Sequence, residues 1–286
     1  MNLLNQMRGM TDSIWRDESN RDERFQRVFM AAGWQAWKRL ARRPLTTKLF
    51  NKYRFRAYPD CTVSSAAFYS RIPNSRHIEF FRTQISGGTL IDVGANVGLV
   101  SMLLADKIEH ALLFEPNPIA AARARENVRL NRLAYEVHEL ALSDQNGTVT
   151  FENVGGANPC NRAVVGFTTT APTITVLRST LDDFLAIHAP LPTPITAIKI
   201  DVEGHENSVL RGMRSVLRTH RPRTIMFEYL QRTNLKETFE IFSECSYRVM
   251  FLTKSGKTQW ATVDVEPLQD LFACPEELGQ ELAQAS

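Results

Sequence analysis

From residue 89 onward, short apolar runs alternate with helical segments, and the links between them are brief. The runs at 89–93, 111–114 and 136–142 have the length and composition of buried strands, and 118–133 has the pattern of a helix. Parallel strands need a crossover connection, which is usually a helix. This alternation predicts an α/β fold with a mostly parallel sheet.

The alternation breaks over residues 145–194 and then returns. Asn146-Gly147 is a common two-residue hairpin turn, so we expect residues 140–143 to pair with 148–151. After the break, strands are predicted at 195–200, 224–227, 247–252 and 270–274, and helices at 205–219 and 235–243. We therefore place a core at 87–255, with an insertion at about 145–194, inside a domain that covers 59–286.

Acidic residues stand at the carboxyl ends of the predicted parallel strands. In chain order these are Asp92, Glu115, Asp144, Asp201 and Glu228. Ligands of open α/β sheets bind at this edge. Because an unpaired buried carboxylate is costly, acids at every strand end indicate a ligand site rather than packing.

The turn after the first strand, DVGANVG at residues 92–98, is the most specific motif. Its glycines allow a tight turn, and Asn96 can adopt the left-handed backbone conformation. Glu115 follows Gly98 by 17 residues, which suits a carboxylate that accepts hydrogen bonds from both ribose hydroxyls. The third glycine of a nicotinamide dinucleotide motif is displaced by one residue, and Asp92 suits an ammonium group better than a phosphate. S-adenosylmethionine therefore fits better than NAD.

Several segments together resemble the FkbM family of S-adenosylmethionine-dependent methyltransferases. They are LIDVGANVGLVSMLLA, LLFEPNP, ALSDQNGTVTF, STLDDFL and AIKIDVEGHENSVLRGM. The resemblance covers about residues 60–255. It implies the class I methyltransferase fold, which is Rossmann-like: a seven-stranded, mostly parallel sheet with an antiparallel last strand and helices on both faces.

The resemblance also implies roles for individual residues. Those expected to line the methionine end of the cofactor are Asp92, Gly94, Ala95, Asn96 and Gly98. Glu115 resembles the acid that binds the ribose, and Ser143 with Asp144 resembles the pair beside the adenine. Asp201 is expected near the reacting sulfonium.

A hydroxyl that accepts a methyl group must also lose its proton. The candidates for this role are Asp201, Glu203, His205 and Glu206. His205 could be the base, since imidazole titrates near neutral pH. The alternative is that His205, Glu203 and Glu206 only stabilise the start of a helix.

Asp201 and Glu228 end adjacent predicted strands and could hold a divalent cation, because hard cations prefer carboxylates. Two acids alone are a weak metal signal. We favour the alternative, in which Asp201 orders the amino group of the cofactor and Glu228 pairs with an arginine, and we assign no metal ligands.

Residues 1–58 differ from the rest of the chain in charge. They hold thirteen Lys or Arg against five Asp or Glu, and residues 31–58 hold eight basic residues and no acid. We interpret residues 1–58 as a helical extension whose aromatic side chains pack on the main domain. Peripheral contact of residues 31–58 with an anionic membrane is the alternative, and nucleic acid is not the expected partner.

We predict O-methylation of a hydroxyl on a small molecule, natural product or glycan, with residues 60–81 and 153–172 covering the acceptor. The first alternative is a nitrogen, carboxyl or macromolecular acceptor that docks through the basic segment. Others are a non-catalytic cofactor-binding module and a dinucleotide-dependent oxidoreductase. The first ten residues lack an apolar core, so we expect no signal peptide and a cytoplasmic location.

Overall fold

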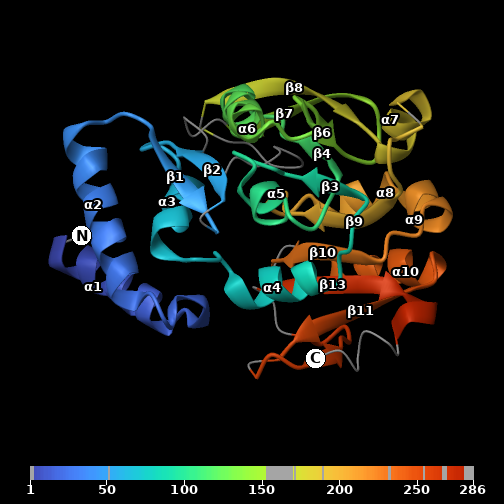
Figure 1. The fold of residues 1–286 in the computed structure, drawn as a ribbon. Helices are drawn as coiled ribbons and strands as arrows, with labels where there is room; N and C mark the ends of the chain where they lie inside the picture. The colour runs from blue at the N-terminus through green and yellow to red at the C-terminus, as the bar shows by residue number, and fades with distance from the viewer. Residues whose placement is uncertain are drawn as a thin grey trace.

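The computed structural model describes residues 3–50, 52–152, 170, 172–188, 190–230, 233–253, 255–265 and 269–279. Within these ranges an eight-stranded sheet forms the centre, in the order β12-β11-β13-β10-β9-β3-β4-β5 (Figure 1). Its strands are β3 (Thr89–Val93), β4 (His110–Phe114), β5 (Tyr135–His138), β9 (Ile195–Ile200), β10 (Thr224–Tyr229), β11 (Tyr247–Leu252), β12 (Thr258–Trp260) and β13 (Gln269–Pro275). Strands β5, β4, β3, β9 and β10 are parallel, and β13 is antiparallel to both of its neighbours. The predicted class I methyltransferase fold is confirmed, with β12 as a short added edge strand.

Helices cover both faces of this sheet. One face packs against α4 (Ser75–Thr83), α5 (Leu99–Leu103) and α6 (Pro118–Asn131), and the other against α7 (Leu181–His188), α8 (Glu206–Arg211), α9 (Arg214–Thr219) and α10 (Leu235–Glu244). Successive side chains of a strand point to opposite faces, so Leu90 joins the first core and Ile91 the second. Burial on both faces explains why the strands read as continuous apolar runs.

The predicted third strand and the hairpin after it are wrong. Residues 136–142 divide into β5, in the main sheet, and β6 (Ala141–Leu142), in a separate three-stranded sheet of order β6-β8-β7. There β8 (Thr173–Ser179) lies between β6 and β7 (Gly147–Glu152), so β6 and β7 do not pair. Asn146 binds the end of β8 instead of forming a hairpin turn, accepting hydrogen bonds from Ser179 Oγ (2.9 Å) and Thr180 N (3.2 Å).

The predicted helix at 205–219 is interrupted at Gly212, between α8 and α9. A Cβ at this position would lie 1.9 Å from the carbonyl oxygen of Ser143. The backbone of the α8–α9 junction therefore packs directly against the chain that follows β6.

The N-terminal segment contains α1 (Leu3–Arg16) and α2 (Arg24–Leu40), as predicted, and also a hairpin of β1 (Leu45–Leu49) and β2 (Tyr53–Ala57) that the sequence pattern did not reveal. Trp34 of α2 stacks on Phe68 of α3 (Thr62–Tyr69) at 4.4 Å. The β2 backbone is held by α6, because Arg56 N donates to Asn127 Oδ1 at 2.7 Å. The boundary at residue 58 stays a prediction.

Across the described ranges, no helix is both long enough and apolar enough to cross a membrane.

Candidate active site

A cavity lies at the carboxyl ends of β3, β4 and β9. The polar and glycine-turn residues that line it include Gly94, Ala95, Asn96, Glu115, Lys199, Asp201, Glu203 and His205. Apolar side chains form much of the remaining wall, among them Val63, Phe114, Leu142 and Phe151. The topology thus brings most of the predicted site residues to one cavity.

The turn after β3 has the backbone that its sequence predicts. Gly94, Asn96 and Gly98 have φ angles of 74°, 50° and 79°, which confirms the left-handed conformation of Asn96. A Cβ on Gly94 would lie 1.8 Å from the carbonyl oxygen of Asp201, so only glycine permits this close approach. Gly98 does not line the cavity: a Cβ there would face Leu113 and Ala124.

Glu115 follows β4 and lines the cavity, although it is only 8% exposed. Its Oε2 accepts a hydrogen bond from Asn96 N and its Oε1 from Asn117 N, both at 2.8 Å. Burial raises the pKa of Glu115 to about 7, although these backbone hydrogen bonds act in the opposite direction. Each carboxylate oxygen has a second lone pair, so the side chain can still accept hydrogen bonds from a ligand diol.

Lys199, near the carboxyl end of β9, was not among the predicted site residues. Its Nζ donates to Gly94 O at 2.9 Å and lies 3.4 Å from Asp92 Oδ1 and 3.5 Å from Asp201 Oδ2. Burial lowers the pKa of Lys199, but the carboxylates of Asp201 and Asp92 raise it by more, so it lies above its ordinary value. The signal available in the sequence was a lysine inside the apolar run of residues 195–200.

Asp92 faces this lysine and does not line the cavity. It is fully buried, and its Oδ2 accepts a hydrogen bond from Ser101 Oγ at 2.6 Å. The ammonium group beside Asp92 is therefore that of Lys199. Together Asp92 and Lys199 fix the glycine turn to β9, and direct contact of Asp92 with a cofactor stays a prediction.

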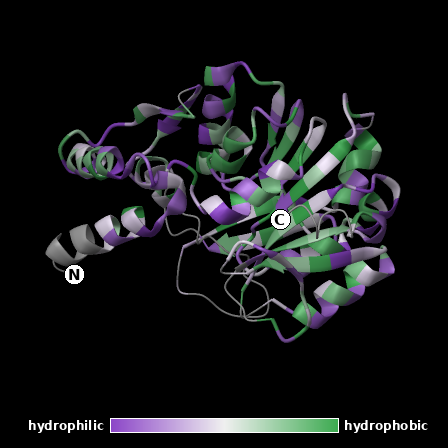
Figure 2. Cartoon of the chain, turned by 60° about the horizontal axis from the view of Figure 1, so that its bottom comes forward, coloured by the Kyte–Doolittle hydropathy of each residue, from purple (hydrophilic) through white to green (hydrophobic). Residues whose placement is uncertain are grey.

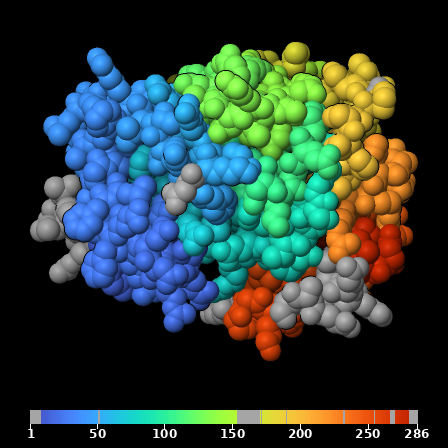
Figure 3. All heavy atoms as spheres, viewed as in Figure 1, coloured from blue at the N-terminus to red at the C-terminus, as the bar shows by residue number. Residues whose placement is uncertain are grey.

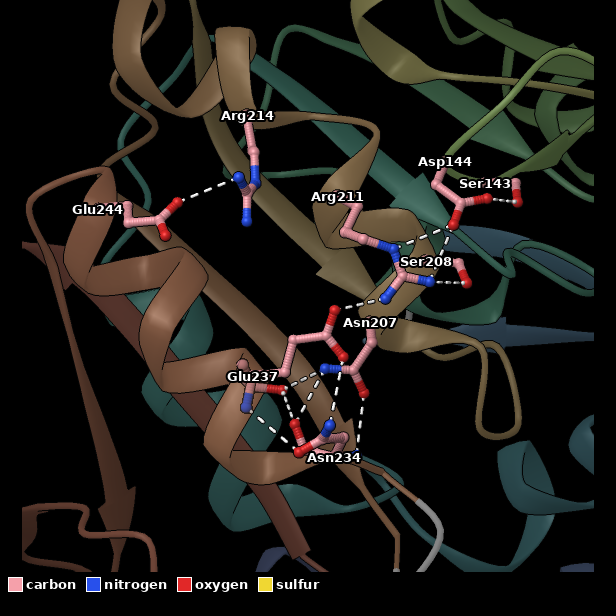
Figure 4. Close-up of polar contacts among 10 residues, drawn as sticks. Ser143, Asp144, Asn207, Ser208, Arg211, Arg214, Asn234, Glu237 and Glu244 are labelled. Atoms are coloured by element: carbon pink, nitrogen blue, oxygen red, sulfur yellow. Dashed lines mark hydrogen bonds and ion pairs between the residues drawn. The ribbon is translucent and has the colours of Figure 1, made fainter.

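Ser143 and Asp144 also lie outside the cavity lining. Ser143 Oγ is 3.0 Å from His205 Nε2, and Asp144 forms an ion pair with Arg211 of α8 at 2.8 Å. Arg211 also pairs with Glu237 of α10 (Figure 4). Asp144 thus belongs to a network that connects the chain after β6 to α8 and α10, while Ser143 contacts the cavity residue His205.

Three of the four candidate catalytic residues line the cavity, and the fourth does not. Asp201, Glu203 and His205 are in its wall. Burial lowers the pKa of His205, which favours the neutral imidazole that a base requires. Glu206 is fully buried and accepts a hydrogen bond from Gly204 N at 2.9 Å, as expected for a residue that stabilises the start of α8.

Asp201, Glu203 and Glu228 form a carboxylate cluster, with one oxygen from each within 4.8 Å of the others. Burial and then the charges of Asp201 and Glu203 raise the pKa of Glu228 to about 8. Among the described residues, Glu228 Oε2 is buried without a hydrogen-bond partner. The cluster can hold a cation or share the proton of a hydroxyl, and the arginine partner predicted for Glu228 stays a prediction.

Only some of the residues predicted to cover the acceptor are among those that the structure describes. Val63, from the 60–81 segment, lines the cavity. In the 153–172 segment, residues 153–169 and 171 lie outside the described residues.

Residues 92–249, more than half of the chain, match the family model of the methyltransferase FkbM domain. The chain belongs to the FkbM methyltransferase family. The match begins at Asp92 and covers the glycine turn, Glu115, Lys199 and the carboxylate cluster. Residues 92–249 therefore form a methyltransferase domain of the FkbM family.

One similar curated protein is the hexuronic acid methyltransferase AglP of Haloferax volcanii. It is 33% identical over 133 residues, which is 46% of this FkbM chain and 52% of AglP. The FkbM chain therefore spans about half the length of this relative.

Solved structures with a similar fold include the FkbM methyltransferase of Methylobacillus flagellatus. It is 15% identical, with a TM-score of 0.42, covering 86% of this chain and 59% of that one. The O-methyltransferase of Bacillus cereus in complex with SAH is 12% identical, with a TM-score of 0.41, covering 70% of this chain and 79% of that one. The strand order of this FkbM chain itself identifies the fold.

Proposed function

We propose that this enzyme transfers a methyl group from S-adenosylmethionine to a hydroxyl of a sugar or a related small molecule. The observation that carries the proposal is the composition of one cavity. A buried carboxylate suited to a diol, Glu115, and the acids Asp201 and Glu203 line the same cavity, and Glu228 clusters with those two acids. The similarity to a hexuronic acid methyltransferase supports a sugar as the acceptor.

The residues of the cavity fit the chemical groups of S-adenosylmethionine. Glu115 would accept hydrogen bonds from the ribose hydroxyls, and Phe114, Leu142 and Phe151 offer apolar surface to the adenine. The backbone of the Gly94–Asn96 turn and the carboxylate of Asp201 would hold the amino-acid end. When bound, S-adenosylmethionine supplies an activated methyl group.

The chain itself would position the acceptor and take up its proton. Holding the acceptor oxygen in line with the methyl group supplies a large part of the rate. The carboxylates of Asp201, Glu203 and Glu228 can accept a hydrogen bond from that hydroxyl. A carboxylate with a pKa near 8, as in Glu228, is a stronger base than an ordinary glutamate. His205 is the other candidate base, and its contact with Ser143 fixes the position of its ring.

A carboxyl acceptor is the second candidate, because a hexuronic acid carries both hydroxyl and carboxyl groups. A carboxylate acceptor needs no base, but it would be repelled by the carboxylate cluster. The acidic wall of the cavity therefore favours the hydroxyl.

Product analysis tests the proposal. The protein is incubated with S-adenosylmethionine that carries an isotope-labelled methyl group and with one acceptor: glucuronic acid, its methyl ester, glucose, a peptide mixture or RNA. The products are then treated with mild base. A sugar product that keeps the labelled methyl group is an ether and supports the proposal. A sugar product that loses the labelled methyl group is an ester and transfers the assignment to the carboxyl group. If only peptides or nucleic acids are methylated, the sugar assignment is wrong.

A further inference from the structure

We propose that the outward face of α2 docks the enzyme on the surface of an anionic lipid bilayer. In Figures 1 and 2, α1 and α2 project from one side of the sheet, and in Figure 3 the N-terminal segment forms one flank of the molecule. This inference concerns a surface away from the proposed active site and does not depend on the acceptor.

An apolar stripe runs along the outward face of α2. Phe25, Phe29 and Leu40 are 72%, 76% and 85% exposed. With Ala32 and Ala36, which are also exposed, they recur at helical spacing, so they share one face over roughly 22 Å. Single exposed apolar side chains are common, but three large ones aligned on one helix form a patch that marks an interaction surface.

The patch continues onto α1 through Trp15. This indole is 44% exposed and packs edge to face on Phe25, with the ring centroids 5.4 Å apart. The guanidinium of Arg24 lies 5.6 Å from the same indole ring. Tryptophan beside arginine is a combination typical of the interface between lipid headgroups and acyl chains.

The opposite face of α2 is anchored, so the helix cannot turn its apolar stripe inward. Trp34 is 1% exposed, stacks on Phe68 and donates a hydrogen bond to Ser65 Oγ at 3.0 Å. The exposed stripe is therefore a fixed property of the fold.

At the C-terminal end of the stripe, the surrounding charges match an anionic surface. Helix α2 contains no acidic residue, and its last turn carries Lys38 and Arg39. Exposed cations continue through the loop and the hairpin, at Arg42, Arg43, Lys48, Lys52 and Arg54. Each basic residue near an anionic membrane adds about 1 kcal/mol of attraction. A lipid bilayer fits this surface better than nucleic acid, because the centre of the protein surface is apolar and the cations lie at one end of it.

Co-sedimentation of the full chain with vesicles tests the proposal. Wild-type protein should bind vesicles of phosphatidylcholine mixed with phosphatidylglycerol, bind pure phosphatidylcholine more weakly, and lose affinity as salt increases. The Phe25→Ser/Phe29→Ser variant should lose at least about tenfold in affinity for these vesicles. The Ile187→Ser variant, which removes an equally exposed apolar side chain on α7, should bind like wild type.

A second set of variants separates charge from apolar contact. Replacing Arg39, Arg42 and Arg43 by Gln should reduce the preference for phosphatidylglycerol, whereas the Lys236→Gln/Lys257→Gln control should retain it in full. Tryptophan fluorescence should shift to the blue on vesicle binding, and the Trp15→Phe variant should lose that part of the shift. Circular dichroism and binding of S-adenosylhomocysteine would show that all variants are folded.

Two results would overturn the proposal. One is equal vesicle binding by the Phe25→Ser/Phe29→Ser variant and the wild type. The other is a wild-type dimer in sedimentation velocity that this variant converts to a monomer, because the apolar stripe would then be covered by a second copy of the chain.

Discussion

Replacing Lys199 by Met tests whether a buried ion pair organises the active site. The side chain of Lys199 is 5% exposed and that of Asp92 is 0% exposed, so neither can be solvated by water if its partner is removed. Methionine preserves the length and apolar stem of lysine and removes the charge. The variant leaves the Asp92 carboxylate buried beside Ser101 alone, and Gly94 O without its donor.

The expected cost follows from this burial. Removing one partner of a buried ion pair costs about 3–5 kcal/mol, because the remaining charge is uncompensated. Asp201 adds little, since its side chain is 47% exposed and water can solvate it. A loss of that size is a large fraction of the roughly 5–15 kcal/mol by which domains are stable.

Urea unfolding followed by circular dichroism measures this cost. The Lys236→Met variant, in which an exposed lysine of α10 is changed, is the matched control and should change the free energy of unfolding by less than about 0.5 kcal/mol. The pKa of Lys199 is raised in the folded state, so its contribution is fully present below its ordinary value of 10.5 and is lost only above it. In the wild type, Lys199 should therefore stay charged over roughly pH 6–9.

A second change distinguishes an ion pair from simple packing. Adding Asp92→Asn to Lys199→Met removes the uncompensated charge and should recover part of the lost stability. If Lys199→Met costs no more than the control, or if Asp92→Asn adds a further loss in that background, the ion pair does not have the role assigned to it.

Three further predictions concern the cavity. Glu115→Gln should weaken binding of S-adenosylhomocysteine in calorimetry by about ten- to a hundredfold, because an amide offers one acceptor oxygen instead of two; unchanged affinity would exclude Glu115 from cofactor binding. The rate of methyl transfer should rise as pH increases through about 8, where Glu228 loses its proton, and Glu228→Gln should flatten that profile. Identical profiles would exclude Glu228 as the base. Gly94→Ala should lower the urea midpoint much more than Gly256→Ala, because both positions have positive φ but only at Gly94 would the Cβ meet backbone. Equal decreases in the urea midpoint would mean that the cost at Gly94 comes from the positive φ alone and not from the contact with backbone.

The part of the fold that local pattern determines could be predicted from the sequence. The bounds of β3, β9 and β11 agree with the predicted strands residue for residue, because each is a mostly apolar run between polar turns. The left-handed backbone of Asn96 was also predictable, since a short polar side chain in a glycine-rich turn has that preference.

The features that depend on distant contacts could not be predicted. β6 pairs with β8, with paired residues 37 positions apart in the chain, and Asn146 contacts the end of β8 rather than forming the local turn that its sequence favours. Lys199 was overlooked because a single charge in an apolar run departs from the pattern of a buried strand. Its partners are Asp92, on the neighbouring strand β3, and Asp201, directly after β9. In the candidate site, the expectation that ligands bind at the carboxyl ends of parallel strands located Glu115 and Asp201. It could not show that Asp92 and Asp144 form ion pairs with Lys199 and Arg211.

The position of β13 affects the order in which the chain can fold during synthesis. β13 lies between β10 and β11 and pairs with both, so these two strands do not pair with each other. On the ribosome, the sheet from β5 to β10 can assemble while the chain is still growing, as domains commonly do from the N-terminal side. β11 can join this sheet only through β13, and until β13 is in place β10 is an exposed edge strand.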